Sequence, residues 1–231
     1  MTNKKNQFPK TMVVITLIIV GLVIATFYSL TRNDAVAPTN EFEEIPNIEG
    51  QPTLGNEGAP VTVIEFGDYK CPACKAWDES IFPLLKESYI DTGKVNYSYI
   101  NTPFHGEESV LAALASESVW DQDPEGFWNF HKEVFQQQPD VQNHDDAWIT
   151  PEKLIEIAEQ VNVNVDLDQL MNDIVNQTYV DEVLNDQAQV EKFNVSLTPS
   201  IFINDTMVED PFDYDTIVKL IEENLEENER E

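Results

Sequence analysis

Residues 61–74 decide the fold, and they read Val61-Thr62-Val63-Ile64-Glu65-Phe66-Gly67-Asp68-Tyr69-Lys70-Cys71-Pro72-Ala73-Cys74. The first part is a β-branched run bounded by a proline and a glycine, which is typical of a strand. After the cysteines, apolar residues recur at helical spacing as far as Gly93, which indicates a helix. Cys71 and Cys74 therefore lie where a strand passes into a helix.

A cysteine at such a junction lies at the N-terminus of a helix. The unpaired amide N–H groups there, and the positive end of the helix dipole, stabilise a thiolate. A lowered pKa would make Cys71 the nucleophile, while Cys74, one helical turn further on, would be the shielded resolving thiol. Such a pair exchanges disulfides through a mixed disulfide on Cys71, which Cys74 then breaks. We therefore predict redox chemistry at this pair.

Two other uses of the cysteines fit the sequence less well. Half of a zinc site would need two more ligands, but the three histidines are scattered singly and no second C-x-x-C exists. A structural disulfide that closes so short a loop would add little stability. We predict no catalytic metal. A structural Ca²⁺ bound by scattered acids stays open, with no ligands that the sequence identifies; a partial EF-hand match at residues 121–132 fails at its last ligand.

The chain that follows the cysteines predicts an α/β fold. Val95–Ile100 alternates apolar and polar residues, so strand, helix and strand form a right-handed βαβ unit with parallel strands. Helical patterns fill the chain between about residues 105 and 194. A short strand at 201–203, with a possible hairpin partner at 207–208, precedes a terminal helix at 213–225. We read this order as a sheet domain interrupted by a helical insertion.

The N-terminus has the features of a membrane anchor. Residues 11–30 carry no charge, and a 20-residue helix spans about 30 Å, the thickness of the bilayer core. Three lysines precede the run, so the positive-inside rule places residues 1–10 in the cytoplasm and the rest outside. We predict a retained signal anchor, a linker over residues 31–52 and a domain over residues 53–231. Cleavage after Ala35-Val36-Ala37 is the alternative, although a proline follows directly.

Charge is distributed very unevenly along the chain. The 13 basic and 43 acidic residues give a formal net charge of −30. Residues 1–32 hold four of the bases and no acid, which leaves nine bases against 43 acids, a net charge of −34, on the remainder. A domain this negative repels phosphate backbones, so nucleic-acid binding is excluded. We interpret the excess acids as a surface adaptation to a saline or alkaline exterior.

The motif around the cysteines resembles the opening of DsbA-like thiol–disulfide oxidoreductases. The resemblance covers residues of about 60–225, is closest to the membrane-anchored BdbD type of Gram-positive bacteria, and implies a thioredoxin fold with a helical insertion. Three further segments match the same family in order: Pro103-Phe104-x-Gly106-x-Glu108-Ser109, Phe127-Trp128-x-Phe130-His131 and Leu197-Thr198-Pro199-Ser200-Ile201-Phe202-Ile203-Asn204.

The resemblance also implies roles for single residues. Thr198 and Pro199 align with a cis-proline loop that faces the disulfide, where the Thr198 backbone would pair with an extended substrate. Glu65 aligns with a buried acid beneath the cysteines, a proton acceptor for Cys74; the alternative is an exposed carboxylate on the strand. The dipeptide between the cysteines is Pro72-Ala73. Strong oxidants of the family carry histidine in place of Ala73, so we expect a weaker oxidant here.

These features predict a membrane-anchored, extracytoplasmic oxidoreductase that introduces disulfides into exported proteins and needs no cofactor beyond its cysteine pair. The resemblance implies reoxidation by a quinone-linked membrane oxidase of the DsbB type. Two alternatives stay open. The first is a reductase or isomerase on the same fold, which a measured reduction potential would separate. The second is a non-enzymatic acidic binding module with an inert disulfide, in which replacing Cys71 would leave the oxidation of secreted proteins unchanged.

Overall fold

The computed structural model describes residues 39–139 and 147–230. The predicted cytoplasmic segment 1–10, the predicted anchor 11–30 and the start of the predicted linker lie outside the described residues. Within the described ranges, no helix combines the length and the apolar character needed to cross a membrane.

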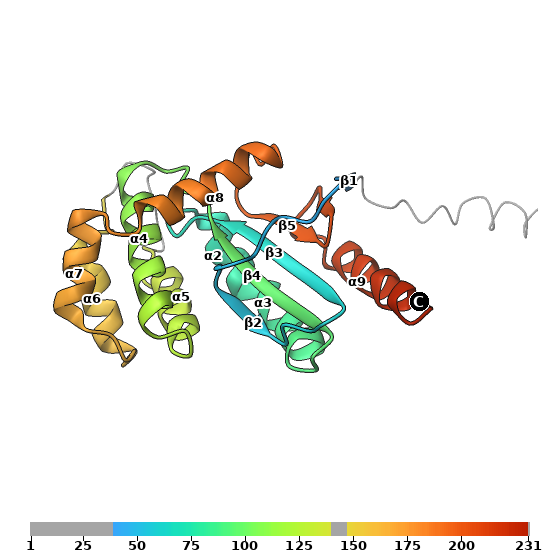
Figure 1. Ribbon diagram of the computed structural model, residues 1–231, viewed down its shortest axis with the longest axis horizontal. Coiled ribbons are helices and arrows are strands. Elements are labelled where there is room, and N and C mark those ends of the chain that lie inside the picture. Colours follow the sequence, from blue (N-terminus) through green and yellow to red (C-terminus); the bar gives the residue numbers. More distant parts are fainter. Residues whose placement is uncertain (1–38, 140–146, 231) are drawn as a thin grey trace, which may run out of the picture. The chain divides into compact units, whose positions relative to one another are not determined.

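A six-stranded sheet lies at the centre of the described domain (Figure 1). The strand order is β1-β6-β5-β3-β4-β2, in which only β3 and β4 run parallel and the other neighbours are antiparallel. The predicted βαβ unit is therefore confirmed. The strands are β1 (Thr39–Glu41), β2 (Thr53–Gly55), β3 (Val61–Gly67), β4 (Val95–Asn101), β5 (Ser200–Ile203) and β6 (Thr206–Val208).

Among the described residues, five helices lie between β4 and β5, within the range predicted for the insertion. Figure 1 shows the first four of them grouped at one side of the sheet. The helices of the described residues are α2 (Pro72–Ser80), α3 (Phe82–Leu85), the π-helical turn η1 (Lys86–Ile90), α4 (Glu107–Gln122), α5 (Phe127–Gln136), α6 (Pro151–Gln160), α7 (Leu167–Asn176), α8 (Val180–Lys192) and α9 (Tyr214–Asn228).

The alternation of side chains along β3 builds a separate core on each face of the sheet. Val61 and Val63 face α2 and α9, where Trp77 and Ile217 are completely buried. Phe66 and its neighbours on the opposite face pack against the end of α8. Because both faces are covered, β4 is buried along its whole length and β3 at all but one of its positions, as expected of a parallel pair. This is the thioredoxin-like arrangement that the family resemblance implied.

The helical insertion has its own core, which also encloses the cysteines. Cys71 and Cys74 belong to the same buried cluster as the aromatic residues of α5 and the apolar residues of α6 and α7. Three aromatic residues of α5, Phe127, Phe130 and Phe135, are completely buried in this core. The cysteine pair lies where the sheet domain and the insertion meet.

The predicted boundary between linker and domain at residue 52 is wrong. Residues 39–41 form β1, which pairs with β6, and Phe42 packs against the rings of Phe193 and Phe202. Gln51 donates from Nε2 to Asp186 of α8 at 2.6 Å. A three-residue polar strand has little propensity of its own, and it forms here because the edge of β6 offers unpaired backbone groups.

The helix that we expected to continue from the cysteines to Gly93 is divided. It ends at Ser80, and α3 and η1 follow after Ile81. Pro83 has no N–H group with which to continue the hydrogen-bond ladder, and its ring crowds the preceding turn. The break lets the later segments turn back toward the start of β4.

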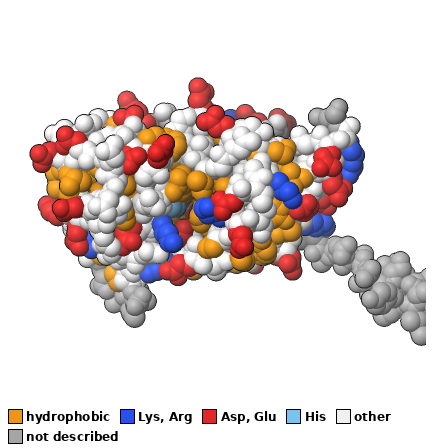
Figure 2. Space-filling model, turned by 90° about the horizontal axis from the view of Figure 1, so that it is seen from below, with side chains coloured by type: hydrophobic (Ala, Val, Ile, Leu, Met, Phe, Trp, Pro, Cys, Tyr) orange, Lys and Arg blue, Asp and Glu red, His pale blue; other side chains and the backbone are white. Residues whose placement is uncertain are grey.

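Figure 2 shows acidic side chains spread over the visible face, with few basic ones among them. They do not gather into one patch there. The interpretation of the excess acids as an adaptation to a saline or alkaline exterior stays a prediction.

Trp77 fastens α2 to the segment before α9, and this contact gives a test of the packing. Its indole Nε1 donates to the carbonyl oxygen of Pro211 at 2.9 Å, and its ring is completely buried. We expect Trp77→Phe to lower the free energy of unfolding by about 2–4 kcal/mol in urea titrations, because it leaves a buried acceptor unpaired and a small cavity. Trp120→Phe is the matched control, since its bond to Gly50 is exposed to water and its loss should cost less. Equal losses in the two variants would contradict this account.

Candidate active site

The turn between β3 and α2 places Cys71 at the first position of the helix. Cys71 is the N-cap of α2, with φ −76° and ψ 120°, and Pro72 follows in the first turn. The Cys71 amide donates to the carbonyl oxygen of Asp68 at 3.0 Å, which closes the turn. Both cysteines are thiols in this structure, and Cys71 is 5% exposed whereas Cys74 is completely buried. Their positions at the strand–helix junction are as predicted.

The two thiols differ sharply in acidity. A hydrogen bond from the Cys74 side chain lowers the pKa of Cys71 to about 5, although burial opposes the shift, and Thr198 and two amides of the first turn also stabilise the thiolate. Burial, together with the same bond to Cys71, raises the pKa of Cys74 well above its ordinary value. Near neutral pH the pair therefore holds one thiolate, on Cys71, and one thiol, on Cys74.

The loop before β5 completes the site from a distant part of the chain. The bond between Thr198 and Pro199 is cis, and the Thr198 carbonyl oxygen lies 3.3 Å from Cys71 Sγ. The structure thus brings the predicted loop directly against the predicted nucleophile. The pairing of Thr198 with a substrate backbone stays a prediction.

Glu65 lies on β3, buried to 1% exposure, rather than on an exposed strand face. Tyr97 donates its hydroxyl proton to Glu65 Oε2 at 2.6 Å, whereas Oε1 is buried without a hydrogen-bond partner among the described residues. Burial raises the pKa of Glu65 to about 8 despite the bond from Tyr97. Glu65 also acts electrostatically on Cys74, whose thiol it helps to keep protonated. A carboxyl that titrates near neutral pH suits an acceptor of the Cys74 proton.

Gly67, at the end of β3, is where the backbone approaches this buried acid closely. A Cβ atom at this position would lie 2.4 Å from the ring of Tyr99 and 2.9 Å from Glu65 Oε1. A side chain here would displace both neighbours, so the packing beneath the cysteines requires glycine.

Several residues of the site were not predicted from the sequence. Asp68 is buried directly before the cysteines, and its amide donates to Cys74 Sγ at 3.4 Å. Its carboxylate binds His105, which follows β4. Gln138 donates from Nε2 to the carbonyl oxygens of Tyr69 and Cys71, at 2.7 and 3.2 Å. The sequence offered one signal for the contact between Asp68 and His105, because the carboxyl ends of parallel strands meet at one edge of a sheet.

A partly buried ion pair closes the other side of the site. Lys70 pairs with Glu108 at the start of α4. The second carboxylate oxygen of Glu108 accepts from the amides of Trp148 and Ile149, at 2.6 and 2.7 Å. Burial opposes ionisation of Glu108, but the bonds from Lys70 and these amides hold its pKa below the ordinary value. The pair fixes the segment before α6 beside the cysteines.

The part of the chain that the structure describes contains no group of three or more His, Cys, Asp or Glu side chains placed to hold a metal ion.

Two thiols of unequal acidity, at a helix N-terminus and against a cis-proline loop, define a thiol–disulfide oxidoreductase of the thioredoxin type. The chain belongs to the thioredoxin family, whose model, described as Thioredoxin, matches residues 47–223.

Known relatives agree with this assignment. Disulfide bond formation protein D of Bacillus subtilis is 42% identical over 193 residues, which cover 84% of this chain and 82% of that protein. The crystal structure of oxidised BdbD from Bacillus subtilis has a TM-score of 0.77 at 41% identity, and the match covers 81% of this chain and 99% of that one. The crystal structure of DsbA from Chlamydia trachomatis, at 22% identity, shares the fold with a TM-score of 0.68 over 80% of this chain and 96% of its own.

The raised pKa of Glu65 has a consequence for stability. An acid that prefers its protonated form in the folded protein contributes stability below pH 4.5, its ordinary pKa, and this contribution is lost as the pH rises through about 8. Glu65→Gln cannot ionise, so we expect the reduced variant to exceed the reduced wild type in unfolding free energy by about 2–5 kcal/mol at pH 9. Urea titrations at pH 4 and pH 9 measure the difference, which should be small at pH 4.

Glu79→Gln is the matched control on the exposed side of α2, and it should leave the pH dependence unchanged. A Glu65→Gln variant that parallels the wild type from pH 4 to pH 9 would show that Glu65 is not a buried titrating acid.

Proposed function

We propose that this protein introduces disulfide bonds into exported proteins, with Cys71 as the attacked sulfur and Cys74 as the resolving thiol. The observation that carries the proposal is the inequality of the two thiols. Cys71 is stabilised as a thiolate, with a pKa of about 5, and stabilising a thiolate favours the reduced form of the pair. A protein whose reduced form is favoured gives its disulfide to substrates. The names of the relatives, which refer to disulfide bond formation, support the same direction.

The reaction is an exchange in two steps. A substrate thiolate attacks Cys71 Sγ, which forms a mixed disulfide and releases the electron pair of the Cys71–Cys74 bond onto Cys74. The second substrate thiolate then attacks its own sulfur in the mixed disulfide and releases Cys71 as a thiolate. The substrate loses two electrons and gains a disulfide, and the protein gains the electrons as one thiolate and one thiol.

Glu65 serves the proton transfer of this exchange. Cys74 leaves as a thiolate in a fully buried place, and the raised pKa of its thiol favours immediate protonation. Glu65, itself buried with a pKa of about 8, holds a proton for this purpose at neutral pH. In the reverse reaction it accepts the Cys74 proton before Cys74 attacks the mixed disulfide.

The Thr198 loop binds the substrate. The peptide group of Thr198 lies within hydrogen-bond distance of Cys71 Sγ, so a substrate segment joined to Cys71 passes directly along this backbone. Backbone pairing accepts many sequences, which suits a protein that acts on unrelated exported chains.

The cellular setting completes the proposal. The apolar segment 11–30 anchors the protein in the membrane with the catalytic domain on the extracytoplasmic side, as the flanking lysines indicate. An oxidising exterior is where structural disulfides form and persist. A DsbB-like, quinone-linked membrane oxidase restores the Cys71–Cys74 disulfide, as the resemblance to DsbA-like proteins implies.

Trapping of the mixed disulfide tests the function. In a Cys74→Ser variant, no second thiol can attack the mixed disulfide on Cys71 and release the substrate. We therefore expect exported proteins to accumulate in disulfide-linked complexes on Cys71. Non-reducing electrophoresis after acid quenching, followed by mass spectrometry, identifies both partners. With the intact pair, the oxidised protein should convert a reduced, unfolded substrate to its disulfide form.

Cys71→Ser is the matched control, because it keeps one thiol but removes the accessible one. It should trap nothing and oxidise nothing. If the Cys74→Ser variant trapped no proteins and the wild type oxidised no dithiol, the reading as an acidic binding module with an inert disulfide would replace this proposal.

A further inference from the structure

A buried carboxylate connects the cysteine turn to the loop that follows β4. Asp68 Oδ2 accepts from the amides of Phe104 and His105, at 2.9 and 3.1 Å, and binds His105 Nδ1 at 2.6 Å. Its other oxygen accepts from the Lys70 amide at 2.9 Å. The side chain of Asp68 has no exposed surface. The orientation of the imidazole beside the redox site is thus set by a group that also forms the cysteine turn.

The surroundings of His105 favour its charged form. The hydrogen bond to Asp68 raises its pKa from the ordinary 6.5, burial opposes the shift, the negative charge of Cys71 adds to it, and Lys70 acts against it. Of the groups described around the ring, Asp68 and Cys71 therefore favour the charged form and Lys70 disfavours it. Lys70 is itself paired with Glu108, which reduces its effect. The side chain of His105 is 24% exposed, so the imidazole can exchange protons with water.

The cysteine motif supplies no charge of its own. The residue between Pro72 and Cys74 is alanine, and the groups that bind the Cys71 thiolate most directly are neutral: the Cys74 thiol, Thr198 and backbone amides. A fixed cation near a thiolate adds to their effect, because opposite charges stabilise each other over longer distances than hydrogen bonds do.

We propose that Asp68 and His105 form an electrostatic pair beside the redox site. Asp68 orients the imidazolium of His105, and this cation stabilises the Cys71 thiolate from outside the C-x-x-C motif. His105 is a positioning and electrostatic residue that forms no bond to the substrate. The inference deepens the proposed oxidoreductase function, since it assigns part of the oxidising power to a residue 34 positions beyond Cys71.

Reciprocal coupling between Cys71 and His105 makes the pKa of His105 depend on the redox state, which would not be so for a purely structural histidine. If the His105 cation lowers the pKa of Cys71, the Cys71 thiolate must raise the pKa of His105 by the same amount. Formation of the disulfide removes the thiolate. The pKa of His105 is therefore higher in the dithiol form than in the disulfide form.

The first measurement is an NMR titration of the histidine Cε1–H signals in both redox states. We expect the His105 pKa to be about half a unit higher in the dithiol form, which corresponds to about a threefold coupling. His131 is an internal reference, because complete burial lowers its pKa to about 3 and it stays neutral over the titration. A His105 pKa that is the same in both forms overturns the inference, whatever the behaviour of any variant.

The second measurement is the equilibrium with glutathione at pH 6 and pH 9. Written with protonated glutathione, the protein disulfide and two glutathione thiols give the Cys71 thiolate, the Cys74 thiol, glutathione disulfide and one proton. At pH 9 glutathione is partly ionised, and this affects the wild type and the variants equally. At pH 6 both Cys71 and His105 are charged, so His105→Asn, which keeps a donor for Asp68 but no charge, should lower the equilibrium constant for reduction about threefold. At pH 9, well above the ordinary pKa of histidine, less of the His105 charge remains, so the difference between the variant and the wild type should shrink.

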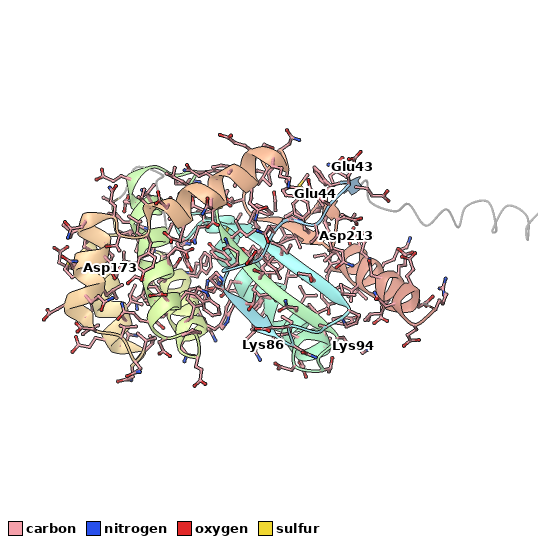
Figure 3. The ribbon with its side chains drawn as sticks, viewed as in Figure 1. Glu43, Glu44, Lys86, Lys94, Asp173 and Asp213 are labelled. Carbon is pink, nitrogen blue, oxygen red and sulfur yellow. The ribbon has the colours of Figure 1, made fainter. Side chains whose placement is uncertain are left out.

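Two further variants separate charge from structure. His105→Lys restores a cation that persists at pH 9, so its equilibrium should lie near that of the wild type at pH 6 and exceed it at pH 9. Lys94→Gln removes one positive charge at the start of β4, the end of the parallel strands opposite to the cysteines (Figure 3), and should change nothing. Equal equilibrium constants for the wild type and His105→Asn at pH 6 overturn the inference.

Both measurements can be interpreted whether or not the proposed function is correct. The titration and the glutathione equilibrium require only that the cysteine pair can be reduced and oxidised. If the protein oxidised no substrate protein but its His105 pKa depended on the redox state, only the proposed function would be contradicted. If the protein were active but its His105 pKa did not depend on the redox state, only the role of the electrostatic pair would be contradicted.

Discussion

The site depends on one interaction, the hydrogen bond from the Cys74 thiol to the Cys71 sulfur across the first turn of α2. It lowers the pKa of Cys71 and raises that of Cys74, so a single contact makes one sulfur an anion and keeps the other a thiol. The bond exists because β3 ends at Gly67 and the turn closes on the Asp68 carbonyl, which makes Cys71 the N-cap of the helix. The remaining features of the site act on this pair.

Three layers of the structure support the interaction. The covered sheet fixes the ends of β3 and β4, from which Asp68 and His105 extend. The helical insertion encloses Cys74 and thereby makes it difficult to ionise. The loop before β5 brings Thr198 against Cys71. Burial pushes Cys71, Cys74 and Glu65 toward their neutral forms. It prevails at Cys74 and Glu65, whereas hydrogen bonds outweigh it at Cys71.

Local sequence patterns predicted much of this. The βαβ unit and the position of both cysteines at the strand–helix junction follow from apolar periodicity, and the structure has both of them. β1 was missed because its three polar residues gain their structure from β6 and not from their own propensity. Thr198 was found only through the family resemblance, since nothing local says which turn faces the cysteines.

The contact between Asp68 and His105 could be predicted from the sequence only in part. Asp68 is part of the most informative stretch of the sequence, but its role depends on a residue 37 positions away, after the next strand. The parallel order of β3 and β4 made the neighbourhood predictable, while the burial of the carboxylate and the direction of the imidazole were not. A contact of this kind can be identified only once the positions of the two strand ends are known.

The acidity of Cys71 in the reduced protein shows whether the pair holds one thiolate and one thiol. Thiolate absorbance at 240 nm, followed from pH 3 to pH 10 in the wild type and in Cys71→Ser, reports this ionisation. The account predicts a step of one thiolate centred near pH 5 in the wild type, with no step there when Cys71 is replaced. A reduced protein that gained no thiolate absorbance until the pH approached 9, the ordinary pKa of a thiol, would contradict it.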